Sequence, residues 1–80
     1  MKVIVNVQLK EGILDPQGKA TEHALEVMGF PGVGGVRIGK QVVLNLETTD
    51  KEAARAEAEE MAKKLLVNPV TEDFTIEFPA

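Results

Sequence analysis

The sequence predicts an α+β fold with the element order β-α-β-β-α-β, an antiparallel sheet that carries both helices on one face. Two observations predict it. Near both ends of the chain, apolar residues alternate with other residues, as in strands that are buried on one side. Between these strands lie two segments of helical spacing, separated by a further apolar stretch rich in β-branched residues. This order is that of ferredoxin-like domains.

The first strand is followed by a helix with clear boundaries. The apolar face of the strand comprises Val3, Val5, Val7 and Leu9. We expect Asp15 to be the N-cap, Pro16 the first helical residue, and Gly29 the residue of positive φ where the helix stops. The helix face that we expect to pack on the sheet comprises Ala20, Ala24, Leu25 and Met28.

The middle of the chain predicts a β-hairpin after a glycine-rich loop. Residues 36–38 and 41–46 are expected to be its two arms, joined by a two-residue turn at Gly39-Lys40 with glycine first. The face of the sheet away from the helices then carries Ile4, Ile38 and Val43. We therefore expect homo-oligomerisation to complete or cover this sheet.

The second helix has the strongest pattern. Thr49 and Glu52 fit a capping box at its start, and Asn68-Pro69 is expected to end it with a left-handed Asn. The face expected to pack on the sheet comprises Ala54, Ala58, Met61, Ala62 and Leu65. A last strand follows, in which the alternating apolar residues are Phe74, Ile76 and Phe78. We expect residues 1–80 to form one domain that begins with a strand rather than a signal peptide.

Composition excludes several functions. The 80 residues include no cysteine, so disulfides and thiolate metal sites are excluded. The chain also contains no serine and a single histidine, so the common nucleophilic constellations cannot be assembled. A net charge of −4 and the absence of Trp and Tyr disfavour nucleic acid, and no apolar run is long enough for a membrane span. We expect no catalysis by this chain alone.

Two motifs have ordinary interpretations that we prefer. Residues 34–40 match the start of a P-loop, but Gln41 stands where Ser or Thr would hold magnesium, and a strand rather than a helix follows. His23 lies beside Glu22 and Glu26 on the first helix, but no second histidine completes a usual metal site. We interpret the first as a hairpin and the second as a solvated side chain.

Several cations fall in the half of the chain that is richest in glycine and proline. They could converge on an acidic partner or an anion, or they could be scattered for solubility, and composition does not decide between the two. These cations are Lys10, Lys19, Arg37 and Lys40.

The sequence resembles the PurS family, the small subunit of phosphoribosylformylglycinamidine synthase. The resemblance spans almost the whole chain and rests on five segments: V-x-V-x-L-K at 5–10, G-I-L-D-P-Q-G at 12–18, A-L-E-V-M-G-F at 24–30, V-R-I-G-K at 36–40, and M-A-K-K-L-L-V-N-P-V-T-E at 61–72.

The resemblance implies a non-catalytic accessory subunit of a cytoplasmic, glutamine-using ligase complex. Such a subunit bridges a synthetase subunit and a glutaminase subunit, assists ammonia transfer in de novo purine biosynthesis, and forms a dimer or tetramer with itself. It binds no cofactor or metal, since ATP and Mg are used by the synthetase partner. The residues we expect at the partner interface are Asp15, Pro16, Gln17, Gly18, Arg37, Gly39, Lys40, Asn68 and Pro69.

One alternative stays open from the residues alone. Paired domains of this topology also serve as small-molecule-binding regulatory modules, and the loop at 32–35 could then cradle a ligand with its backbone amides.

Overall fold

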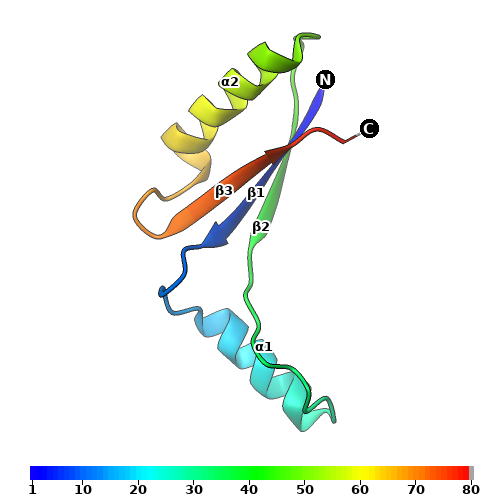
Figure 1. Ribbon diagram of the computed structural model, residues 1–80, viewed down its shortest axis with the longest axis vertical. Helices are drawn as coiled ribbons and strands as arrows, with labels where there is room; N and C mark the ends of the chain where they lie inside the picture. Colours follow the sequence, from blue (N-terminus) through cyan, green and yellow to red (C-terminus); the bar gives the residue numbers. More distant parts are fainter. Residues whose placement is uncertain (80) are drawn as a thin grey trace.

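The computed structural model describes residues 1–79 and shows an α+β protein built on a three-stranded antiparallel sheet of order β2-β1-β3 (Figure 1). The chain runs through β1 (Lys2–Leu9), α1 (Pro16–Val27), β2 (Lys40–Asn45), α2 (Lys51–Met61), a π-helical turn η1 (Ala62–Leu66) and β3 (Glu72–Glu77). The predicted α+β class and antiparallel sheet are confirmed.

The core lies between α2 and one face of the sheet. Val3, Val5 and Val7 of the central strand are buried, and the register places Val5 opposite Val42 of β2 and Ile76 of β3. Against these valines packs a row of small residues on α2 and η1, which are fully buried: Ala54, Ala58 and Ala62. Alanines at i, i+4 and i+8 share one helix face, so this spacing lets α2 lie close to the sheet.

Helix α1 is not on the sheet. Figure 1 shows it beyond the end of the sheet, far from α2, and within residues 1–79 it makes no extensive contact with any strand or with α2. The prediction of two helices on one face is therefore wrong. Of the helix face expected to be buried, Ala20, Ala24 and Met28 are exposed, and Leu25 is half-buried. An apolar helix face predicts that the helix packs against something, but not against which element.

The hairpin predicted over residues 36–46, with its turn at Gly39-Lys40, is also absent from the described chain. Residues 36–39 run as a single extended segment, and β2 begins only at Lys40 and pairs with β1. Gly39 does not form the predicted turn, because a hairpin turn with glycine first requires a positive φ that Gly39 lacks. A Cβ at position 39 would instead lie 2.6 Å from the Val7 carbonyl oxygen, so glycine is needed there for close approach to β1.

Both ends of α2 differ from prediction. Its N-cap is Asp50 rather than Thr49, since the Asp50 carboxylate accepts a hydrogen bond from Glu52 N at 3.1 Å. At the other end, Val67 N donates to Ala62 O across the π-helical turn, which adds one residue to the turn. Leu65, expected in the core, lies within this turn and is 84% exposed, while Val67 after it is buried. Met61, also expected in the core, is 38% exposed.

The face of the sheet opposite α2 is bare in the single chain. Ile4 and Val43 stand opposite each other there, as predicted, while Ile38 lies in the extended segment before β2. Beside this apolar pair, Asn6 accepts a hydrogen bond from Gln41 and donates one to Glu77, at 3.1 and 3.0 Å. These hydrogen bonds link the side chains of all three strands on the face opposite α2.

Candidate functional site

The residues singled out from the sequence gather at one end of the sheet, which we call the junction. Here the turn after β1 (residues 10–15), the start of α1, the extended segment 36–39 and the loop before β3 (residues 68–71) come together. The junction is also where both ends of the α1 region meet the sheet (Figure 1).

Asp15 is the most deeply placed polar residue of the junction. Its side chain is only 5% exposed, and its two carboxylate oxygens accept hydrogen bonds from Gly18 N at 2.8 Å and from Ile38 N at 2.7 Å. These hydrogen bonds, the Ile38 bond first, lower the pKa of Asp15 below its ordinary value, and the charge of Arg37 adds to this against the opposing effect of burial. Asp15 is therefore the predicted N-cap, followed by Pro16 at the first helical position.

Gly18 is required by sterics. It is the one buried residue of α1, and a Cβ at this position would lie 2.1 Å from the Val36 carbonyl oxygen. The close approach brings the first turn of α1 against the extended segment. Gly18 was predicted as an interface residue, but its steric role could not be predicted, because Val36 is distant from it in sequence.

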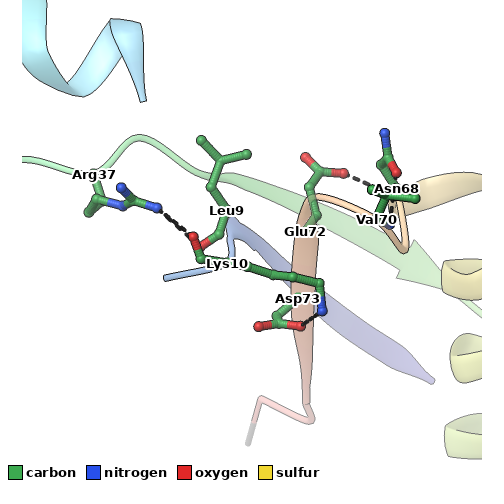
Figure 2. A network of polar contacts seen from close by, with 7 residues as sticks. All are labelled: Leu9, Lys10, Arg37, Asn68, Val70, Glu72 and Asp73. Atoms are coloured by element: carbon green, nitrogen blue, oxygen red, sulfur yellow. Dashed lines mark hydrogen bonds and ion pairs between the residues drawn. The ribbon is translucent and has the colours of Figure 1, made fainter. Parts of the chain in front are cut away.

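Arg37 binds backbone carbonyls of the turn after β1. Its guanidinium donates to Ile13 O at 2.9 Å, to Lys10 O at 3.0 Å and to Leu9 O at 3.4 Å. The planar, multi-donor guanidinium is suited to such a role. Figure 2 shows the guanidinium reaching across from the extended segment to this turn.

The loop at Asn68-Pro69 is held by its own side chains. Val70 N donates to Asn68 Oδ1 at 3.0 Å, and Asn68 N donates to Glu72 Oε1 at 2.8 Å (Figure 2). Asn68 does not adopt the left-handed conformation, since within residues 1–79 only glycines have positive φ, and Gly29 is one of them at +98°. Asn68 is thus a turn residue, as Asn commonly is, rather than a helix C-cap.

Two shallow concavities share the junction. One, of about 290 Å³, is lined by Asp15, Pro16, Gln17, Gly39 and Lys40 together with the end of β1 and Glu72. The other, of about 270 Å³, is lined by Pro69, Lys10, Asp73 and neighbouring residues, and again by Glu72. The structure therefore brings all three predicted segments to one surface.

Two residues of this surface were missing from the predicted interface. Lys10 forms an ion pair with Asp73 at 2.8 Å, and Lys10 N donates to Thr71 O at 2.9 Å. Glu72 separates the two concavities and caps the Asn68 loop. The pattern N-P-x-x-E was the available signal for Glu72, because a carboxylate four residues after Asn can reach back to its amide.

The four cations considered from the sequence do not form one cluster. Lys10 pairs with Asp73, Lys19 lies 3.6 Å from Glu22, and Arg37 binds carbonyls. Lys40 is exposed at the start of β2. Within residues 1–79 no group of three or more potential ligands is arranged to hold a metal ion, and no helix is long and apolar enough to cross a bilayer.

The fold and the junction define a small α+β protein whose distinctive residues shape a surface and fasten its segments together. The chain matches, over residues 2–80, the family described as "PurS: Phosphoribosylformylglycinamidine (FGAM) synthase". The chain belongs to the PurS family.

Individual relatives agree with this assignment. The phosphoribosylformylglycinamidine synthase subunit PurS of Bacillus subtilis is 47% identical over 76 residues, which cover 95% of this chain and 89% of the relative. The crystal structure of Methanocaldococcus jannaschii PurS has a TM-score of 0.87 at 39% identity and covers 95% and 92% of the two chains. A chain in the structure of PurLQS from Thermotoga maritima also has a TM-score of 0.87, at 32% identity with 95% and 93% covered.

Proposed function

We propose that this chain is the small accessory subunit of a cytoplasmic phosphoribosylformylglycinamidine synthase. In that complex it bridges the synthetase and glutaminase subunits and assists the transfer of ammonia between them during purine biosynthesis. The observation that carries the proposal is the likeness to a chain of the Thermotoga maritima PurLQS structure across 95% of this chain. As a member of the PurS family, the chain acts as a subunit of the enzyme.

The chemistry is assigned to the partners. A chain without serine or cysteine and with one histidine offers no nucleophile–base pair, so this subunit is proposed to be non-catalytic. ATP, Mg and glutamine are then bound by the synthetase and glutaminase, and this subunit binds none of them.

The partner contact is assigned to the exposed part of the junction. Asp15 and Gly18 are buried and Arg37 binds carbonyls, so these residues shape the surface from within. The proposed contacts are the exposed members of the predicted interface: Pro16, Gln17, Gly39, Lys40, Asn68 and Pro69.

Reconstitution of the three subunits tests this function. Omission of this chain is expected to abolish product formation from glutamine and to leave more of the activity with added ammonia, because free ammonia bypasses the transfer. Lys40→Glu should reduce the glutamine-dependent rate, whereas Lys2→Glu, an exposed lysine at the opposite end of the sheet, should not. Glutamine-dependent turnover that is unchanged without this chain would refute the accessory role.

A further inference from the structure

Helix α1 and residues 28–35 form a projection that we call the arm. It stands beyond the end of the sheet, and the molecule is accordingly 47 Å long but only 14 Å thick (Figure 1). Two segments connect the arm to the sheet, residues 10–15 leading in and residues 36–39 leading out. Because the described part of α1 makes no extensive contact with the sheet or α2, the orientation of the arm within one chain depends on these connections.

The two connecting segments are fastened to each other by side chains of opposite charge. Asp15, from the incoming segment, accepts the amide of Ile38 in the outgoing one. Arg37, from the outgoing segment, donates to the carbonyls of Lys10 and Ile13 in the incoming one. Each segment therefore contributes one side chain that forms hydrogen bonds with the backbone of the other.

Close approach of the backbones at this point requires glycine, which has no side chain. Gly18 allows the first turn of α1 to touch Val36, and Gly39 allows the outgoing segment to touch Val7 of β1. Within residues 1–79 no buried polar side-chain atom lacks a partner, so the fastening is fully satisfied.

We propose that Asp15 and Arg37 are positioning residues that lock the arm at one orientation to the sheet. The carboxylate is shared between two roles: one oxygen caps α1, and the other holds the outgoing segment. Loss of the second role alone leaves α1 helical and turns the junction into a hinge.

Asp15→Asn separates these roles. Asn is a good N-cap, so we expect its carbonyl oxygen to keep the bond from Gly18 N and α1 to keep its start. The NH2 group that replaces the second oxygen is a donor and cannot accept from Ile38 N. The matched control is Asp50→Asn, because Asp50 caps α2 with a bond to Glu52 N and joins no second segment. The chain contains no cysteine, so spin labels can be placed at Ala24→Cys on α1 and Ala56→Cys on α2, both exposed.

The measurement is the distance distribution between the two labels, with labelled chain diluted in excess unlabelled chain. We expect a narrow distribution for the parent and for Asp50→Asn, and a broad one for Asp15→Asn. Amide exchange at Ile38 should be about tenfold faster or more in Asp15→Asn, while exchange at Gly18 changes little.

Arg37→Lys provides a second test that keeps the positive charge. It tests the orientation of the arm even if Asp15→Asn does not fold. A lysine ammonium cannot reproduce the planar fork that reaches Ile13 O and Lys10 O, so the distribution should broaden again. Folded variants that keep the parent's distance distribution and its exchange rate at Ile38 would overturn the proposal.

Discussion

At the scale of single residues, Asp15 is held as a carboxylate by its surroundings. The amides of Ile38 and Gly18 stabilise the ionised form, the nearby Arg37 charge adds to this, and the pKa of Asp15 is lowered. A folded-state pKa below the unfolded one means that the unfolded chain binds more protons as the pH falls through that interval. The contribution of Asp15 to stability is therefore present above the ordinary carboxyl pKa of 3.8 and is lost in acid as the pH falls through the lowered pKa.

The pH dependence of stability tests this account. Asp15→Asn should lower the free energy of unfolding at pH 7. The difference from the parent should shrink as the pH falls below 3.8, because the unfolded parent then binds a proton that the folded parent binds only below its lowered pKa. Urea denaturation of both proteins between pH 7 and pH 2 measures the difference. A difference that is the same at every pH would show that the charge of Asp15 contributes nothing.

At the scale of elements, α2 is the only helix that packs on the described sheet. Its contact face consists of alanines, which place the helix backbone close to the fully buried Val3 and Val5. Burial of such a valine contributes about 1.5–3 kcal/mol relative to exposure. The small side chains are therefore needed for shape, and larger ones would push α2 off the sheet.

Enlarging one of these alanines should be destabilising. Ala58→Leu adds volume to a fully buried site and is expected to lower the free energy of unfolding by about 1–3 kcal/mol. Ala56→Leu, on the exposed side of α2, should change it by less than about 0.5 kcal/mol. Chemical denaturation compares the two, and equal effects would contradict the assigned packing face.

The sequence allowed some elements to be predicted well. The alternation in β1, the cap and proline at the start of α1, and the alanine spacing of α2 are local signals with local causes, and the structure confirms them. The position of α1 could not be predicted from the sequence, because an apolar helix face does not show which element packs against it. The steric roles of Gly18 and Gly39 could not be predicted for a similar reason, because each lies against a carbonyl distant in sequence, that of Val36 and that of Val7.

The same distinction holds at the site. Asp15, Arg37 and Asn68 were predicted as contact residues, but what the structure reveals is their role inside the chain, in bonds to residues such as Ile38 and Lys10. Spacing along the chain shows that a residue is unusual. Only the fold shows which of its atoms are already engaged.

At the scale of the whole molecule, the single chain is more extended than its length requires. Its radius of gyration is 15.9 Å, whereas a compact chain of this size has about 12 Å. Large apolar side chains are accordingly exposed on the arm, among them Val27 at 73% and Met28 at 71%. A small core with this much exposed apolar surface favours the proposed self-association.

Self-association predicts a melting temperature that depends on protein concentration. Raising the concentration a hundredfold should increase the melting temperature by several degrees, because association stabilises the folded chain by mass action. Calorimetry at two concentrations, with sedimentation at the same concentrations, measures both quantities. A constant melting temperature for a monomeric species would contradict the proposed dimer or tetramer.

The chain enters and leaves the arm at the same end of the sheet. Both connecting segments join this end, and the C-terminal end of α1 lies far from it (Figure 1). Lengthening α1 by whole turns, with a matching extension of the loop, would therefore leave strand register and core unchanged. In evolution the reach of this protein can be adjusted as a separate module, without rebuilding the part that folds it.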